Sequence, residues 1–185
     1  AAAPSKPVDG GYNRLLLGGD SGAGREGLRP DSLSVVSVDA KTGSSVIVGI
    51  PRNLEEVPLG GSPLSKIYPD GYNCGDDCLI DFLYTEAYSH KNLYTAAKYD
   101  NKDIGALTLV DAASAVTGLK VQYYAMVDMA GFSDIVAALG GTTVAVKQKV
   151  IFVAGPDRRL KSPGYVNPAK QHMSGPTRPG QAASR

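Results

Sequence analysis

The sequence is poor in the residues that build metal centres and nucleic-acid interfaces. Its 185 residues include two cysteines, two histidines and no tryptophan. The 19 Lys and Arg residues are nearly balanced by 18 Asp and Glu residues, so the formal net charge is only +1. A basic field that would attract nucleic acid is therefore missing, and we expect no nucleic-acid partner. No run of about 18 apolar residues occurs, so the sequence predicts no membrane-spanning helix within it.

Standard phosphate-binding motifs are also missing. The sequence has no Gly-x4-Gly-Lys-Ser/Thr loop and no GxGxxG in the required context. What is present suits one globular domain, because 185 residues with 43% hydrophobic content can bury a real core. Residues 1–11 contain small residues and two prolines without periodicity, which is typical of a linker. We therefore expect the folded domain to begin at residue 12.

Residues 12–53 contain three segments whose composition is typical of β-strands. An apolar run over residues 12–18 predicts a strand that is buried on both faces. Two β-rich runs, 33–38 and 45–50, flank a turn sequence and predict a hairpin. A loop with several glycines separates the first run from the second, and Pro51 ends the third because proline cannot donate to a β-ladder.

Helical periodicity follows in the second half of the chain. Asp77 is a candidate cap for a helix over residues 78–88, and Asp103 is a candidate cap for a second helix that ends at Gly118. A third helix has its apolar residues at i, i+3, i+4 and i+7 and ends at two glycines. That helix covers residues 132–139, and further strands are expected over residues 122–127 and 142–146.

Four charged residues lie where the apolar patterns stop: Asp20, Arg29, Asp31 and Arg52. Strand ends are where open α/β sheets usually place their ligands. Carboxylates hold hard divalent cations, and arginines bind phosphate oxygens bidentately. One such residue alone is usually a solvated turn residue or cap, but four around one glycine-rich loop indicate a phosphate or metal site. Lys66, in the long loop that follows, is within the same region, where a solvated lysine is the ordinary role.

The ordered series of motifs resembles the LytR-CpsA-Psr (LCP) family of bacterial cell-wall glycopolymer transferases. The resemblance rests first on LLLGGDS, GLRPDS, VVSVDAKTG and VGIPRNL. KIYPDGYN, YYAMVDMAGFSDIVAALGGTTVAV and NPAKQHMSG then follow in the family's order. The match covers residues 13–173, so we interpret residues 12–173 as an LCP-like catalytic domain. The IPRNL form and the cysteine-containing insert are most similar to actinobacterial members.

This resemblance implies a fold, a reaction and a set of roles. The fold would be α/β of the α-β-α type, with a central mixed sheet flanked by helices and a hydrophobic cleft for a polyprenyl chain. The enzyme would transfer a glycan phosphate from a polyprenyl-diphosphate-linked glycan to peptidoglycan, the glycan being arabinogalactan in an actinobacterium. Asp20 and Asp31 would hold Mg²⁺, and Arg29 and Arg52 would bind the diphosphate together with Lys66. Arg29, Asp31 and Arg52 would be the catalytic residues.

The resemblance also implies a location and exposes a departure. Members normally carry an N-terminal transmembrane anchor ahead of such a linker, so we expect a domain at the extracytoplasmic face of the cell membrane. Residues 174–185 lack the arginine-containing helix that members have there, and we expect a disordered or altered tail and a truncated C-terminal part. Because those arginines are missing, two alternatives to the transferase stay open. They are a polyprenyl-phosphate binding module without catalysis and a lipid-diphosphate pyrophosphatase.

Cys74 and Cys78 lie four residues apart. A metal site would need further Cys or His ligands nearby, and the histidines, His90 and His172, are distant in sequence. Two buried reduced thiols and a small disulfide remain as alternatives. We favour the disulfide because the compartment implied by the resemblance is oxidising. Asp81 follows shortly, where the family commonly has Asn, and its pattern fits a site residue and a helix-surface charge equally well.

Overall fold

The computed structural model describes residues 7, 10–19, 29–152 and 164–173. The chain divides into two compact units, residues 1–129 and residues 130–185, and each is described by itself. Most of the predicted linker, the glycine-rich loop with Asp20, and the predicted tail 174–185 lie outside the described residues.

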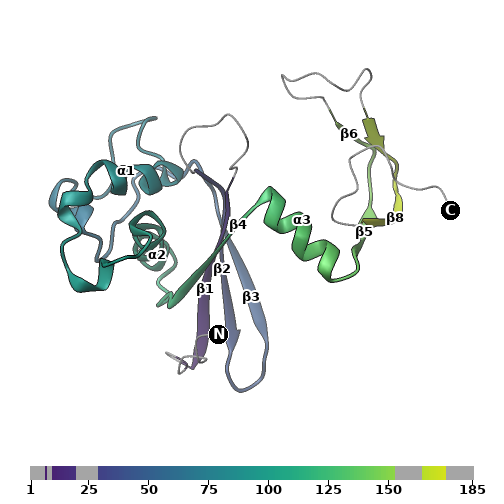
Figure 1. The fold of residues 1–185 in the computed structure, drawn as a ribbon, viewed down its shortest axis with the longest axis horizontal. Helices are drawn as coiled ribbons and strands as arrows, with labels where there is room; N and C mark the ends of the chain where they lie inside the picture. The colour runs from purple at the N-terminus through teal and green to yellow at the C-terminus, as the bar shows by residue number, and fades with distance from the viewer. Residues whose placement is uncertain (1–6, 8–9, 20–28, 153–163, 174–185) are drawn as a thin grey trace. The chain divides into compact units, whose positions relative to one another are not determined.

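The first unit is built on a four-stranded sheet with the strand order β3-β2-β1-β4 (Figure 1). β1 (Gly11–Gly19) pairs antiparallel with β2 (Pro30–Asp39) and parallel with β4 (Tyr123–Asp128). β3 (Ser45–Ile50) pairs antiparallel with β2, so β2 and β3 form the predicted hairpin. The α/β class with a central mixed sheet is confirmed.

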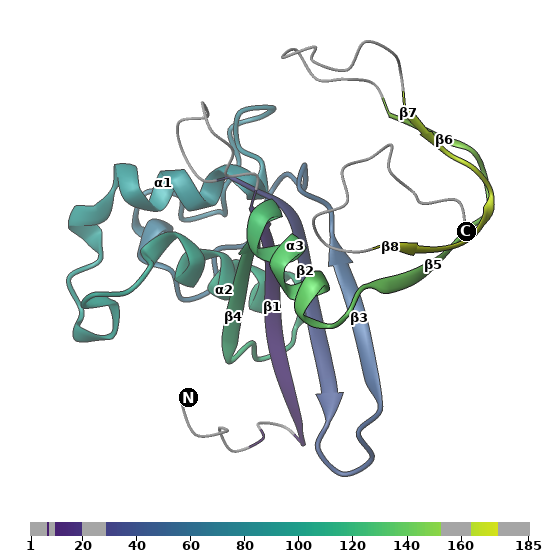
Figure 2. The ribbon, with the colours of Figure 1, turned by 45° about the vertical axis from the view of Figure 1, so that its right-hand side comes forward.

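The expectation that β1 is buried on both faces is wrong. Leu15 and Leu17 are buried at 0% and 2% exposure, whereas Leu16 between them is 42% exposed. Successive side chains of a strand point to opposite faces. In the first unit, α1 and α2 lie on the same face of the sheet (Figures 1 and 2), and the buried leucines point toward them. A nearly continuous apolar run therefore did not mean burial on both sides.

The helix predicted from residue 78 begins later. α1 spans Leu83–Ser89 and follows a 3-10 turn, η2, at Ile80–Phe82, and neither has a side-chain cap. Asp77 is therefore not a helix cap. Leu79 has an extended backbone, with ψ of 153°, and keeps the chain out of helical geometry until Ile80. The cap predicted for the next helix is confirmed. α2 spans Ile104–Thr117, and the Asp103 side chain accepts a hydrogen bond from the Ala106 N–H.

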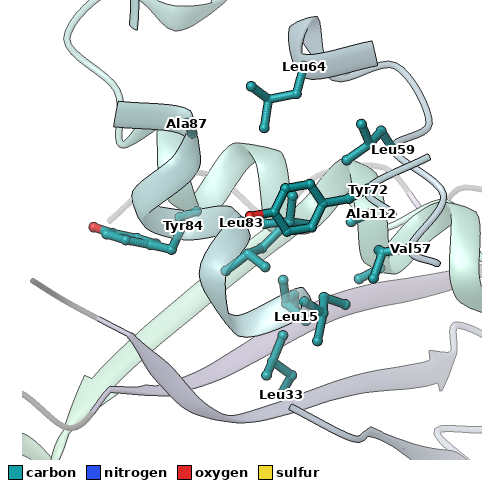
Figure 3. Close-up of a cluster of buried hydrophobic side chains, with 14 of the residues drawn as sticks. Leu15, Leu33, Val57, Leu59, Leu64, Tyr72, Leu83, Tyr84, Ala87 and Ala112 are labelled. Atoms are coloured by element: carbon teal, nitrogen blue, oxygen red, sulfur yellow. The ribbon is translucent and has the colours of Figure 1, made fainter. Parts of the chain in front are cut away.

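A hydrophobic core joins the sheet to α1, α2 and the loop between β3 and α1 (Figure 3). Leu15 and Leu33 come from the sheet, Leu83 from α1 and Ala112 from α2. Val57 comes from the loop, which also contains an isolated bridge between Val57 and Tyr72. Short 3-10 turns complete this unit: η1 (Pro63–Lys66), η3 (Lys91–Leu93) and η4 (Ala97–Tyr99).

The described residues of the second unit form one helix and two strand pairs (Figure 2). The helix predicted over residues 132–139 and the strand over 142–146 are both confirmed, as α3 and β5. Throughout the described residues, no helix has the length and apolar character needed to cross a bilayer. The bounds are α3 (Met129–Ala138), β5 (Thr142–Val146) with β8 (Ala169–Met173), and β6 (Val150–Phe152) with β7 (Gly164–Val166).

Candidate functional site

Two neighbouring strands, β2 and β3, bring their charged flanking residues to one end of the sheet. Gly18 is opposite Ser32, and the pairing shifts by one residue before Gly19 meets Pro30. Leu33 is opposite Ile50, so β3 ends beside the start of β2. Arg29 and Asp31 flank the first residue of β2, and Arg52 follows β3 by two residues. The structure therefore places Arg29, Asp31 and Arg52 at neighbouring strand ends, as the sequence predicts.

Each arginine of this region is paired with a carboxylate. Arg52 Nη1 lies 2.5 Å from Asp31 Oδ1, and the two side chains are 58% and 41% exposed. Arg29 Nη2 lies 2.8 Å from Asp81 Oδ2, and here the arginine side chain is 44% exposed whereas the aspartate is 2% exposed. The Arg29 guanidinium also stacks over the Phe82 ring, 3.9 Å from its centroid. We call Arg29 and Arg52 the clamp arginines.

Backbone hydrogen bonds close these pairs into a ring of contacts. The Asp81 N–H donates to the Arg52 carbonyl oxygen at 3.3 Å, and the neighbouring Ile80 N–H donates to the Leu54 carbonyl oxygen at 2.9 Å. Arg52 pairs with Asp31, which is two residues from Arg29 along the chain, and Arg29 returns to Asp81. Two strand ends and the η2 turn are thus held together by charged and backbone contacts.

Two further predicted site residues remain, Asp20 and Lys66. Asp20 lies outside the described residues. Lys66 is the last residue of η1, is exposed, and forms no ion pair within the part of the chain that the structure describes. Asp81, which the sequence left between two interpretations, belongs to the ring. Its pairing with Arg29 joins residues 52 positions apart, so no local sequence pattern could have assigned it.

The two cysteines are joined by a disulfide, the alternative favoured from the sequence. Cys74 and Cys78 have their Cα atoms 5.1 Å apart. Cys78 is 1% exposed and belongs to the hydrophobic core. The bridge therefore fixes a short loop to the core three residues before Asp81.

Two tyrosines of the KIYPDGYN segment lie in the loop between β3 and α1. Tyr68 and Tyr72 pack edge to face with ring centroids 5.0 Å apart. The Tyr68 hydroxyl donates to Glu86 Oε1 at 2.7 Å. Burial is the main cause that raises the pKa of Tyr68 to about 12, and this hydrogen bond is the second cause. Burial also raises the pKa of Tyr72 to about 12, so both hydroxyls stay protonated at neutral pH and neither serves as a base.

The described part of the site has balanced charges and many N–H groups that can donate hydrogen bonds to phosphate oxygens. Two guanidiniums face two carboxylates, Asp31 and Asp81. A guanidinium has five N–H donors, so an arginine that donates to one carboxylate retains donors for phosphate oxygens. Among the described residues, no group of three or more His, Cys, Asp or Glu side chains is placed to hold a metal ion. Of the two carboxylates, Asp31 is the one exposed to solvent. Its oxygens are of the kind that Mg²⁺ prefers as ligands.

Comparison with known proteins assigns the chain to a family. The profile of the LytR_cpsA_psr family matches residues 2–177. The chain belongs to the LytR_cpsA_psr family. The LCP chain is also 28% identical over 163 residues to the cell wall biosynthesis protein LcpA of Corynebacterium glutamicum. That match covers 77% of this chain and 30% of LcpA.

Solved LCP structures share the fold. The crystal structure of B. subtilis TagV is similar with a TM-score of 0.58 at 21% identity, covering 91% of this chain and 53% of TagV. The family protein YwtF (TagT) with bound octaprenyl pyrophosphate lipid is similar with a TM-score of 0.54 at 18% identity. That match covers 95% of this chain and 57% of TagT. The LCP chain thus spans less than a third of LcpA and just over half of these two structures.

Proposed function

We propose that this LCP domain transfers a glycan phosphate from a polyprenyl-diphosphate-linked donor to a hydroxyl group of cell-wall peptidoglycan. The observation that carries the proposal is the pair of clamp arginines held at one end of the sheet by Asp31 and Asp81. Family membership, the similarity to a protein named for cell wall biosynthesis and the fold shared with a TagT structure that holds octaprenyl pyrophosphate support it.

The proposed reaction is one phosphoryl transfer. The oxygen of the acceptor hydroxyl attacks the phosphorus that bears the glycan, the phosphorus–oxygen bond to polyprenyl phosphate breaks, and polyprenyl phosphate leaves. The hydroxyl proton passes to a carboxylate that holds no metal. Asn53, which follows Arg52, is an amide and cannot accept that proton. The clamp arginines bind the phosphate oxygens and stabilise the negative charge that develops on them.

Mg²⁺ is part of the proposal. Asp31, together with Asp20, would hold the ion, and the ion would neutralise charge on the diphosphate. Lys66 is proposed as a further diphosphate ligand, reaching from η1. Because the described guanidiniums and carboxylates balance in charge, an added cation would favour binding of a multiply charged anion.

The donor's lipid and the cellular location are also proposed. An apolar cleft between the sheet and its helices would take the polyprenyl chain. The domain would act at the extracytoplasmic face of the cell membrane, attached through a membrane anchor. In an actinobacterium the transferred glycan would be arabinogalactan.

One assay tests the reaction and its alternatives. The chain is incubated with a polyprenyl-diphosphate-linked glycan and Mg²⁺, with and without a peptidoglycan acceptor. Joining that depends on the acceptor supports the transferase. Release without acceptor indicates a pyrophosphatase, and bound, unchanged donor indicates a binding module.

Substitution of Arg52 makes the assay specific for the site. Loss of one transition-state donor of this kind costs roughly 10²–10³ in rate, so Arg52→Ala should abolish measurable transfer while the circular dichroism spectrum stays unchanged. Arg14→Ala is the matched control, because Arg14 is exposed near the start of β1, at the other end of the same sheet. Near-normal transfer by Arg52→Ala would refute the assignment.

A further inference from the structure

The buried carboxylate of Asp81 is the least expected group in the described site. Its side chain is 2% exposed, and its Oδ1 has no hydrogen-bond partner among the described residues. Burying a carboxylate is costly unless it is fully paired. Asp81 is paired through one oxygen only, to an arginine that is itself 44% exposed. Stability alone therefore gives no reason for a carboxylate at this position.

The contacts of Asp81 and its neighbour hold one guanidinium from two sides. Asp81 Oδ2 accepts from Arg29 Nη2 at 2.8 Å, and the Phe82 ring lies under the guanidinium face at 3.9 Å. An ion pair fixes the in-plane orientation of the group, and a cation–π contact fixes its plane. One of five donors is used by Asp81, so the remaining donors stay available for a ligand.

The same turn also fixes the other clamp arginine, but through the main chain. The Asp81 N–H donates to the Arg52 carbonyl oxygen, and the Ile80 N–H donates to the Leu54 carbonyl oxygen. The η2 turn is thus hydrogen-bonded to the two residues that flank Asn53. A displacement of Asp81 would change the relation between the two clamp arginines.

We propose that Asp81 is a positioning residue that presents Arg29, in a fixed relation to Arg52, to the diphosphate. It acts through Arg29 and does not touch the ligand itself. The inference rests on the proposed function, because it takes the diphosphate as the group that the clamp arginines bind. Preorganised donors lose no freedom on binding, so the cost of losing Asp81 should appear in ligand affinity.

The first test is a double-mutant cycle with inorganic diphosphate as the probe, measured by calorimetry at low salt with and without Mg²⁺. Asp81→Ala should weaken binding about tenfold, the scale of one charge-assisted hydrogen bond, and Asp81→Asn should restore part of the loss. In an Arg29→Ala background, Asp81→Ala should change the affinity less than twofold. An equal loss in both backgrounds would mean a merely structural role, and no loss in the native background would overturn the proposal.

The second test needs no ligand and therefore separates this inference from the proposed function. Nitrogen-15 relaxation of the Arg29 Nε–H group should report greater mobility in Asp81→Ala than in the native chain. Asp77→Ala is the matched control, since Asp77 is an exposed aspartate four residues away and removes the same charge. If the native chain binds no diphosphate, the proposed function fails while this measurement still decides the positioning. Unchanged Arg29 mobility in Asp81→Ala would refute it.

Discussion

Substitution of Gly105 by alanine should destabilise the first unit, although alanine is normally the better helix former. Gly105 lies in the first turn of α2 and is buried. A Cβ atom added there would lie 2.7 Å from Cδ2 of the Tyr84 ring and 2.8 Å from the Tyr84 carbonyl oxygen. The ring could turn, but the carbonyl oxygen belongs to the backbone of α1, so the two helices would have to separate.

The magnitude follows from two opposing effects. Gly→Ala in a helix interior gains about 1 kcal/mol, whereas overpacking of a closely packed contact costs about 1–3 kcal/mol. Three contacts under 3.0 Å, one of them to backbone, place this site at the upper end of that overpacking range, so we expect a net loss of about 1–2 kcal/mol. For a chain of this size that corresponds to a fall in Tm of roughly 2–8 °C.

The assay is urea and thermal unfolding followed by far-UV circular dichroism. Gly61→Ala is the matched control, because a Cβ at Gly61 meets nothing within 4 Å, and we expect its stability to change little. α1 continues directly from the η2 turn that holds Arg29, so Gly105→Ala should also weaken diphosphate binding. A Gly105→Ala chain as stable as the native one, or more stable, would refute the reasoning.

Three further predictions concern the supports of the site. Reduction of the Cys74–Cys78 bridge should lower the free energy of unfolding by about 2 kcal/mol, from the loop-entropy relation for so short a loop, and melting with and without a phosphine reductant measures this. Asp103→Ala removes the cap of α2 and the acceptor of the Tyr84 hydroxyl, so it should cost about 1–2 kcal/mol in urea unfolding, with Asp103→Asn costing less. Tyr68 ionises near 10.0 when unfolded and at about 12 when folded, so the unfolded chain loses this proton first as pH rises. Stability should therefore fall above about pH 10, and a pH series of melting curves, with tyrosinate absorbance, would contradict this if the Tm stayed level to pH 12.

The sequence sufficed to place the clamp arginines because strand ends are local features. Pro51 stops β3 just before Arg52, and β2 begins beside Arg29, so pairing of the two strands as a hairpin brings both residues to one end of the sheet. Capping was equally local, as Asp103 shows. The helical spacing of apolar residues over two turns predicted α3 for the same reason.

What the sequence could not supply depends on contacts between distant segments. The pairing of Asp81 with Arg29 spans 52 residues and requires the η2 turn to lie against the start of β2. The late start of α1 reflects the extended backbone at Leu79 that follows the disulfide loop. The alternating burial of β1 was missed because Leu16 is as apolar as its neighbours, so composition alone did not reveal which face the helices of the first unit cover.

β3 has a consequence for how the chain behaves in solution. It forms one end of the four-stranded sheet, so no other strand of the described residues pairs with its outer side. Val46 and Ile47 along it are 63% and 69% exposed. An apolar strand with free backbone donors and acceptors is a template onto which a strand of another molecule adds. At high protein concentration, self-association of this chain should therefore start at β3, with the charged end of the sheet left accessible.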